Sequence, residues 1–514
     1  MAEVAIAFVG FMGAGKSEAA GAAAAELGEE AQDADQLIER ELGEPIASFF
    51  EREGEAAFRE REERLSLELL ERGGVISLGG GAVESERVRE ALRRHVATWC
   101  RVDEDAAWER SRDTGRPLAV DRDGFAARYR VRLPLYEEVA RVVLPEGGAE
   151  AGQAVAPWLS AVRGLPEVRI AWARSSSGGY PAAVGPGAPA LLEAPEIGGR
   201  LGVSRWFAVA DAGALRHQEE LLPRSEAVIE VEAGEESKTL AEAERVLRKL
   251  AGAGARRDDG VIAFGGGVVG DLAGFCASAY QRGIPVVQVP TTLVAQVDSA
   301  YGGKTGVDLP EAKNYVGAYH MPAAVLADPR TLATLPGAEL AAGFVEVLKT
   351  ALISGGPLWD RVSALDALDP AELGDVIFAC ARTKIDVVAA DERDRGGRAV
   401  LNLGHTVGHA IEAASGYTHY RHGEAVGLGL LATLRLSDAG ELRDQVRGIL
   451  EHHGLPTALE GGIGTEEVLA AAELDKKRTA EGVGFVLLER PGEPREGASV
   501  DPVRVRAAVE ELRT

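Results

Sequence analysis

Short apolar runs separated by helical stretches dominate the first two thirds of the chain. They read VAIAFV (4–9), VISL (75–78), VIAF (261–264) and VVQVP (286–290). Apolar runs of this length, alternating with patterns of helical period, predict buried parallel strands joined by helices. VISL and VIAF each run into three glycines, where no Cβ blocks the close approach of a ligand to the backbone. The pattern therefore predicts an α/β protein with ligand sites just after two of its strands.

The hydrophobic pattern changes at two places. Around AVRGLPEV (161–168) one helical stretch stops at Gly-Leu-Pro, and a new apolar run, VRIAWA, begins. After about residue 327 the strand signals fade, and Ala/Leu/Glu-rich helical patterns continue to the C-terminus. A chain of 514 residues is also too long for a single core. We therefore expect three domains, over residues 1–164, 165–327 and 328–514, the last of them helical.

Composition and charge exclude several classes of protein. The formal net charge is -25, so we expect no basic face for nucleic acid. The N-terminal apolar run has no basic segment before it, so we expect a strand and not a signal peptide; no apolar run is long enough to span a membrane. Cys100, Cys276 and Cys380 are widely separated, which favours reduced thiols and a cytoplasmic location.

Lysine is rare, and its positions indicate chemistry. Of the 56 basic residues, only nine are lysine. An acidic chain must capture anionic ligands with local groups of Lys and Arg, and a lysine that persists marks a place where the wide arginine fork is a poor substitute. The nine lysines are at positions 16, 238, 249, 304, 313, 349, 384, 476 and 477.

Gly10-x4-Gly15-Lys16-Ser17 fits the Walker A pattern, with a predicted strand before it and a predicted helix after it. Backbone N–H groups and the helix N-terminus are expected to hold the phosphates of ATP, with Lys16 bridging the β and γ phosphates and Ser17 ligating Mg²⁺. The predicted nucleotide contacts are Gly13, Ala14, Gly15, Lys16, Ser17 and Glu18. Asp33 and Asp35 follow the next strand signal; such a pair orders Mg²⁺, orients a substrate hydroxyl, or caps a helix.

Over residues 1–164 the order and spacing of the motifs resemble shikimate kinase. The matched motifs are GxxGxGKS, the DxD pair, FRxxE, GGG, RPL and RxPLYxE. The resemblance implies a P-loop kinase domain with a three-layer parallel sheet and Mg²⁺ near Asp33. It also implies a lid over about 111–123 whose Arg116 closes on the phosphates. Shikimate would be held by Asp35, Arg59, Gly81 and Arg132, with its carboxylate facing the arginines and Asp35 orienting the attacking hydroxyl.

Two features of this half depart from the family or leave a choice open. Glu18 stands where the family usually continues Ser-Thr, which bears on ATP affinity. The arginine on the adenine side is either Arg110 or Arg112, since both lie at the edge of the lid.

A second glycine motif, Gly265-x-Gly267-x-x-Gly270, follows VIAF and fits the dinucleotide fingerprint. No acid falls between Asp271 and Asp298, where the usual ribose-binding acid lies, so an ordinary dinucleotide-binding dehydrogenase is not expected.

A group of histidines follows in the helical part of the chain. His405 and His409 are four residues apart on a predicted helix, a spacing that lets two imidazoles reach one metal, and His419 and His422 follow closely. Glu346 stands three residues before Lys349, which places both on one helix face. Histidines grouped with a helical glutamate favour a metal site.

Residues 167–514 resemble 3-dehydroquinate synthase along nearly their whole length. PTTLVAQVDSAYGGKTGVD and LNLGHTVGHAIE are highly specific to that family and its sugar-phosphate cyclase relatives. The resemblance implies an α/β NAD-binding domain followed by an all-helical metal-binding domain. Zn²⁺ or Co²⁺ would be held by Glu346, His405 and His422, with His409 a catalytic group beside the metal.

The resemblance also assigns contacts for NAD⁺ and for the substrate. The NAD⁺ contacts are Glu235, Lys238, Gly267, Val268, Val269, Gly270, Asp271, Thr291, Thr292, Asp298, Thr331 and Thr334. Lys304 and Lys313 would lie between the cofactor and the substrate phosphate. The pocket for a heptulosonate phosphate would be completed by Arg282, Lys313, Asn314, Lys349, Lys384, Arg398, Asn402 and one of Lys476 and Lys477. Ala233, Ala300 and Asp308 depart from the family pattern.

The two resemblances together predict a bifunctional enzyme of the shikimate pathway that binds small molecules, with dimerisation through the synthase half as the family implies. Alternatives for the second half are a valiolone-type or deoxy-inosose-type cyclase, or a glycerol-dehydrogenase-like oxidoreductase. A gluconate-type kinase is an alternative for the first half, and so is a P-loop domain that only binds nucleotide to regulate its neighbour.

Overall fold

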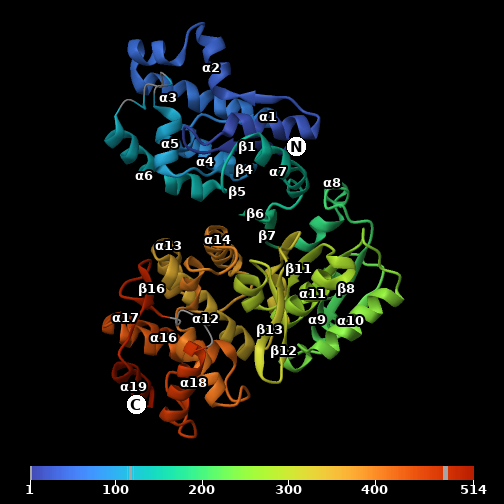
Figure 1. Ribbon diagram of the computed structural model, residues 1–514. Coiled ribbons are helices and arrows are strands. Elements are labelled where there is room, and N and C mark those ends of the chain that lie inside the picture. Colours follow the sequence, from blue (N-terminus) through green and yellow to red (C-terminus); the bar gives the residue numbers. More distant parts are fainter. Residues whose placement is uncertain (1–2, 113, 115–117, 120, 478–483, 514) are drawn as a thin grey trace. The chain divides into compact units, whose positions relative to one another are not determined.

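The computed structural model describes residues 3–112, 114, 118–119, 121–477 and 484–513 (Figure 1). They divide into two compact units, residues 1–174 with 179–203, and residues 175–178 with 204–514. The domain boundaries expected at 164/165 and 327/328 stay predictions. Among the helices described, none combines the length and apolar character that crossing a membrane requires.

A sheet with strand order β2-β3-β1-β4-β5-β6-β7 forms the centre of the first unit. Strands β1 to β6 pair in parallel. Every residue of β1 is buried, which explains why its sequence is a continuous apolar run without polar alternation. The strands are β1 (Ile6–Val9), β2 (Ala31–Asp33), β3 (Val75–Ser77), β4 (Val96–Cys100), β5 (Val142–Leu144), β6 (Arg169–Ser175) and β7 (Gly178–Val184).

Helices of the first unit connect these strands. Helix α1 begins directly after the glycine loop and packs closely on α7, where Gly152 lies against the backbone of Ala19. The helices are α1 (Lys16–Leu27), α2 (Ala34–Leu42), α3 (Ile46–Arg72), α4 (Glu86–Leu92), α5 (Glu104–Ser111), α6 (Arg122–Val139), α7 (Ala149–Val162) and α8 (Pro195–Gly198).

A parallel sheet with strand order β14-β11-β10-β8-β9 forms the α/β part of the second unit. The order of the chain reverses between β8 and β10, and ligands bind at such a switch point of a parallel sheet. Helix α11 (Gly267–Ala279) begins there, straight after β10. The strands are β8 (Trp206–Asp211), β9 (Val228–Val231), β10 (Gly260–Gly265), β11 (Val286–Pro290) and β14 (Ala324–Ala327).

Two helices connect strands of this sheet, α9 (Ala212–Gln218) between β8 and β9 and α10 (Leu240–Gly252) between β9 and β10. A separate hairpin pairs β12 (Lys304–Leu309) antiparallel with β13 (Ala312–Tyr319).

Helices make up most of the rest of the second unit. Residues 342–353 of α12 are all buried, so this helix forms the middle of the helical core. The helices are α12 (Gly337–Ser354), α13 (Gly356–Ser363), α14 (Gly374–Ala390), α15 (His405–Ala414), α16 (His422–Leu436), α17 (Gly440–His452), α18 (Thr465–Lys477) and α19 (Pro502–Glu510). The fold class is as expected, with one addition, the short antiparallel pair β15 (Phe485–Leu488) and β16 (Pro494–Ala498).

Two glycines of α16 bring the helices that carry the predicted metal ligands into contact. A Cβ on Gly423 would overlap the carbonyl oxygen of Ala342 in α12, and a Cβ on Gly429 would overlap the carbonyl oxygen of Gly404, just before α15. These close approaches hold the start of α16 against α12 and α15.

Replacing Gly423 by alanine should therefore loosen this packing. Because the new methyl group meets backbone that cannot move aside, Gly423→Ala is expected to lower the free energy of unfolding by about 1–3 kcal/mol. Gly427→Ala is the matched control: its Cβ meets only side chains at ordinary distances of 3.4 Å or more, and alanine favours the helix. Scanning calorimetry of both variants measures the difference; equal melting temperatures would contradict the packing argument.

Candidate active sites

A loop of glycines joins β1 to α1 in the first unit. Gly10, Gly13 and Gly15 have φ angles of 149°, 78° and 74°, which other residues rarely adopt. A Cβ on Gly13 would come within 2.9 Å of the carbonyl oxygen of Ala107, so the loop backbone has no room for a side chain there. The exposed N–H groups at the start of α1 suit the phosphates of ATP.

Lys16 and Ser17 lie where the Walker A pattern requires them. The Lys16 ammonium donates to the carbonyl oxygen of Phe11 at 3.2 Å, so its side chain folds back along the loop. Ser17 Oγ lies 3.3 Å from Ser77 Oγ at the end of β3, which places the predicted Mg²⁺ ligand beside the second glycine turn. Glu18 is exposed in the first turn of α1.

The structure separates the two arginines that the sequence left as alternatives. Arg110 donates to the carbonyl oxygen of Gly13 at 3.3 Å, whereas Arg112 pairs with Glu109 at 2.9 Å. Arg110 is therefore the one that lies against the phosphate loop. Arg116, predicted on the lid, lies outside the described residues.

Asp33 and Asp35 have different surroundings. Asp33 caps α2 by accepting a hydrogen bond from the backbone of Gln36 at 3.1 Å. Asp35 is exposed, and its Oδ1 lies only 3.0 Å from the point where a Cβ on Gly79 would be. Asp35 thus faces the Gly79–Gly81 turn, and its role in orienting a hydroxyl stays a prediction.

The two predicted acceptor-binding arginines share a carboxylate of the protein itself. Glu84 lies 3.4 Å from Arg59 Nε through one oxygen and accepts from Arg132 Nε at 2.9 Å through the other. The Arg132 side chain is only 2 % exposed. A Cβ on Gly81 would overlap the Arg59 guanidinium, which places that arginine directly at the turn.

Glu62 fixes Arg59 from the buried side. It forms an ion pair with Arg59 and is itself buried. Burial raises the pKa of Glu62, Arg59 lowers it, and Asp35 adds to the rise. Sequence reasoning passed over both acids: Glu62 is the last letter of FRxxE, while no sequence signal marked Glu84.

In the second unit, a buried lysine lies at the switch point of the sheet. Lys238 pairs with Asp271, in the first turns of α11, at 2.6 Å, and lies 3.8 Å from Glu235. Burial lowers the pKa of Lys238, but the two carboxylates outweigh it and hold the value above its usual range.

The glycine turn between β10 and α11 packs tightly on the end of β11. The backbone N–H of Thr291 donates to the carbonyl oxygen of Gly265 at 3.0 Å, and a Cβ on Gly266 would come within 2.9 Å of Thr292. These contacts bring the predicted NAD⁺ residues at the ends of β10 and β11 together, beside the N-terminus of α11. A helix start preceded by glycines suits a pyrophosphate.

Thr331 and Thr334 are engaged within the protein. Gln296 donates to the Thr331 hydroxyl at 2.8 Å, and Gln218 donates to the Thr331 carbonyl oxygen at 2.5 Å and to the Thr334 hydroxyl. The structure therefore places both threonines in a network that ties the segment after β14 to α9 and to Gln296, and their contact with NAD⁺ stays a prediction.

The β12–β13 hairpin presents two of the rare lysines. Lys304 pairs with Asp394 at 2.5 Å, and Lys313 lies over the ring of Tyr417, 4.8 Å from its centroid. Asp308 accepts from the backbone of Asn314 at 2.6 Å, and Asn314 has a φ of 56°. The departure at position 308 is thus part of the hairpin, stabilising an asparagine in the left-handed conformation.

Asp298 holds two lysines from different helices. Its carboxylate pairs with Lys349 of α12 at 3.2 Å and with Lys384 of α14. Burial and the neighbouring cations lower the pKa of Lys384 although Asp298 opposes the shift. Arg398, which follows α14 in the sequence, is also buried. Its guanidinium donates to the carbonyl oxygens of Gly302 and Glu392 at 3.3 and 3.1 Å.

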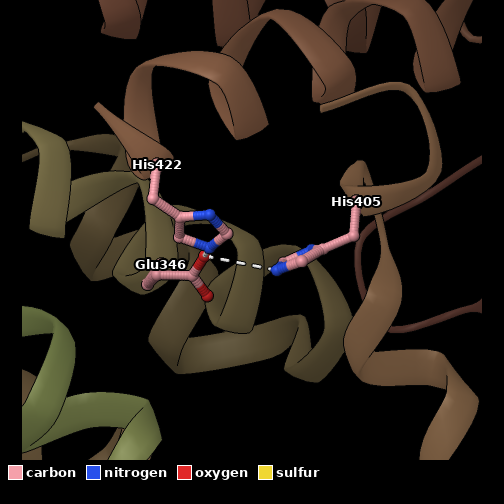
Figure 2. A group of neighbouring side chains, drawn as sticks. All are labelled: Glu346, His405 and His422. Atoms are coloured by element: carbon pink, nitrogen blue, oxygen red, sulfur yellow. Dashed lines mark ion pairs between the residues drawn. The ribbon is translucent and has the colours of Figure 1, made fainter. Parts of the chain in front are cut away.

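Glu346, His405 and His422 converge in the arrangement expected of metal ligands (Figure 2). Glu346 Oε1 lies 3.6 Å from His405 Nε2 and 3.4 Å from His422 Nε2, and one ligand atom from each residue lies within 4.8 Å of the others. Glu346 is 1 % exposed, and its carboxylate lies between Lys349 on one oxygen and the two histidines on the other.

The protonation states of Glu346 and His405 suit a divalent metal. Burial would raise the pKa of Glu346, but Lys349 at 2.5 Å and the two histidines hold it well below its usual range. Burial and Lys349 hold the pKa of His405 well below its usual range, so its ring is neutral. His405 Nδ1 lies 3.2 Å from the carbonyl oxygen of Leu403, which leaves Nε2 for a ligand bond. One carboxylate oxygen and two imidazole nitrogens suit Zn²⁺ or Co²⁺ with an open position.

His422 has a carboxylate behind it. Its Nδ1 lies 3.4 Å from Glu412, the buried last residue of LNLGHTVGHAIE, while Nε2 faces Glu346. Burial lowers the pKa of His422, but Glu346 and Glu412 outweigh it and raise the value to about 10. His409 is exposed and lies beside the group, its ring centroid 5.2 Å from that of His405. Sequence reasoning missed Glu412, although it belongs to the same motif.

The remaining predicted site residues are Arg282, Asn402 and the two lysines at the end of α18. Arg282 follows the C-terminal end of α11, roughly 20 Å along the helix from Gly267, and lines a cavity of about 550 Å³ with His320. Asn402 ends the short helix over Gly397–Asn402 that leads to α15. Lys476 and Lys477 end α18, and which of them reaches substrate stays a prediction.

Glu412→Gln should weaken metal binding without unfolding the protein. Carboxylates that orient a ligating histidine typically contribute 10- to 100-fold to metal affinity, so the dissociation constant for Zn²⁺ should rise by about that factor. Glu460→Gln is the control, because it removes a carboxylate from an exposed histidine, His419, that lies outside the metal group. Competition with a chromophoric chelator measures both; an unchanged Zn²⁺ affinity in Glu412→Gln would refute the role.

Family models match both parts of the chain. The family model of shikimate kinase matches residues 12–163. The models of the N-terminal and C-terminal parts of 3-dehydroquinate synthase match residues 228–342 and 343–478.

Relatives and solved structures match the second part of the chain. The 3-dehydroquinate synthase of Symbiobacterium thermophilum is 45% identical over 295 residues, 55% of this chain and 82% of that protein. That of Xylella fastidiosa is 45% identical over 293 residues, 54% of this chain and 74% of that protein. The structure of 2-epi-5-epi-valiolone synthase from Streptomyces hygroscopicus subsp. jinggangensis, with NAD⁺ and Zn²⁺ bound, has a TM-score of 0.58, 27% identity, and covers 65% of this chain and 96% of that one.

A 2-deoxy-scyllo-inosose synthase solved with NAD⁺ and Co²⁺ shares the fold, with a TM-score of 0.57 and 24% identity over 66% of this chain and 99% of that one. The chain belongs to the 3-dehydroquinate synthase family and carries a shikimate kinase domain ahead of its synthase part.

Proposed function

We propose that this chain is a bifunctional enzyme of the shikimate pathway. One site transfers a phosphoryl group from ATP to shikimate, forming shikimate 3-phosphate. The other converts 3-deoxy-D-arabino-heptulosonate 7-phosphate to 3-dehydroquinate and releases phosphate. The observation that carries the second assignment is the Glu346–His405–His422 group beside the two lysines on Asp298. We also propose a cytoplasmic location, which the buried free cysteines fit, and a homodimer through the synthase half, as the family implies.

In the kinase site, the chain supplies positioning and charge. Backbone N–H groups of the glycine loop and Lys16 hold the phosphates of ATP, and Ser17 is placed to ligate Mg²⁺. Arg59 and Arg132 receive the acceptor carboxylate, and Asp35 orients its hydroxyl toward the phosphate. Because phosphoryl transfer requires little covalent help, alignment of the hydroxyl accounts for most of the catalysis.

In the synthase site, when bound, NAD⁺ accepts and returns a hydride and the divalent metal acidifies the substrate hydroxyl. Glu346, His405 and His422 would hold that metal. Lys349 and Lys384 offer donors to the substrate anions, while Asp298 keeps both ammonium groups in place. His409 lies at the edge of the group, where an exposed imidazole can hold or move a proton.

A different cyclase activity is the alternative for this half. The solved structures that match it include synthases of a valiolone and of a deoxy-inosose, at 27% and 24% identity. The 3-dehydroquinate synthases are 45% identical to this chain, and the kinase domain at its N-terminal side acts on an acid of the same pathway, which supports the dehydroquinate assignment.

The two activities should be lost separately. Lys16→Ala is expected to lower the rate of shikimate phosphorylation on the order of 100-fold or more, because it removes a cation from the transferring phosphate. It should leave phosphate release from the heptulosonate phosphate intact. His409→Ala or Lys349→Ala should do the converse. Coupled assays for ADP and for phosphate measure both activities; loss of both in Lys16→Ala would contradict independent sites.

Metal removal should also separate the two sites. After dialysis against a chelator, Mg²⁺ with ATP is expected to restore phosphorylation of shikimate alone, because the kinase site offers Mg²⁺ only hard oxygen ligands. Release of phosphate from the heptulosonate phosphate should require added Zn²⁺ or Co²⁺ together with NAD⁺. Full synthase activity in the chelated protein with Mg²⁺ alone would refute the assignment of the metal group.

A further inference from the structure

The acceptor carboxylate position of the kinase site is already occupied by a side chain of the protein. Glu84 spans the two arginines, one oxygen toward Arg59 Nε and the other toward Arg132 Nε. A carboxylate bridging two guanidinium groups is the arrangement that a bound carboxylic acid would make with them. Glu84 comes from the short helix over Ala82–Glu84, immediately after the Gly79–Gly81 turn.

Three carboxylates already face the two arginines before any substrate binds. Arg59 pairs with Glu55 at 2.9 Å and with Glu62, and Glu84 is the acid that it shares with Arg132. An incoming carboxylate would therefore add a fourth negative charge to a group in which acids already outnumber the arginines, unless one of the three acids leaves.

Of these acids, Glu84 is the one that both arginines share and that can move. Glu62 is buried with a side chain 3 % exposed, so moving it would leave an uncompensated charge in the protein interior. Glu55 contacts Arg59 alone and lies on its outer side, 46 % exposed. The Glu84 side chain is 34 % exposed and has water beside it to receive its charge.

Arg132 has one hydrogen-bond donor that the described residues leave unused. Its side chain is almost fully buried, yet its Nη2 has no hydrogen-bond partner among the described residues. Phe11 lies under the guanidinium, 5.7 Å from ring centroid to Cζ, so one face is closed by an aromatic ring. A buried donor without a partner costs free energy, and a second anion at this position would use it.

We propose that Glu84 is an internal carboxylate that competes with the acceptor acid for Arg59 and Arg132 and is displaced when the acid binds. The inference rests on the proposed kinase function and adds a determinant of specificity to it. Only a ligand that brings its own carboxylate can replace the bond that Glu84 gives up, so neutral polyols of similar shape are rejected. The cost of displacement weakens binding of every acid, because part of the gain is spent on breaking the Glu84 pairs.

Removing the Glu84 charge should tighten binding of carboxylic acids alone. In Glu84→Gln and Glu84→Ala, KM for shikimate is expected to fall by about 3- to 30-fold, which corresponds to about 0.6–2 kcal/mol, with kcat within about twofold of wild type. The methyl ester of shikimate, which lacks the carboxylate, should gain nothing. Glu86→Gln is the matched control, since it removes the same charge from an exposed residue at the start of α4.

Calorimetric titration with shikimate and with benzoate measures the same effect without turnover. Tighter binding of both acids in the Glu84 variants, with ATP affinity unchanged, supports the proposal. Equal affinity in wild type and variants, or an equal gain for the ester, overturns it. Wild-type protein that binds shikimate but does not phosphorylate it would refute the proposed function instead, and the titrations would still decide the role of Glu84.

Discussion

The buried carboxylate of Glu346 is the interaction on which the synthase site depends. An isolated charge in the interior of a protein is unstable, and removing one partner of a buried ion pair costs about 3–5 kcal/mol. Lys349, one turn along the same helix, compensates Glu346 from one side, and two imidazoles face it from the other. Lys349 is in turn held by Asp298, which also holds Lys384. Cations, carboxylates and metal ligands therefore form one connected group whose members cannot be moved singly.

The kinase site follows the same rule on a partly exposed surface. Its arginines are each fixed by acids of the chain, Arg59 from the buried side by Glu62 and both arginines by Glu84. In a chain with a net charge of -25, free cationic pockets would attract the protein's own acids. The sites meet this constraint differently. The synthase holds its cations by burial, whereas the kinase pairs its arginines with one partly exposed acid, Glu84.

Much of this could be predicted from the sequence, because local spacing determines it. Strand, glycine turn and helix follow one another around Lys16, and three- and four-residue spacings place Glu346 with Lys349 and His405 with His409. Contacts between segments that are distant in the sequence could not be predicted, because no local spacing reports them. Asp298 meets Lys349 and Lys384 across 51 and 86 residues, and the pairing depends on how α12 and α14 pack. No sequence signal marked Glu84, and Asp308 stood out only as a departure from the family pattern until the hairpin placed it on Asn314.

The metal position tests this account most directly, because two overlapping groups of side chains compete for it. Glu346, His405 and His422 form one group, and His409, Glu412 and His422 form the other. Anomalous diffraction at the cobalt edge, from crystals grown with Co²⁺, locates the ion without reference to activity. The account predicts a single peak within ligand distance of Glu346, His405 and His422, with Glu412 behind His422 and not bound to the ion. A peak between His409, Glu412 and His422 would contradict it.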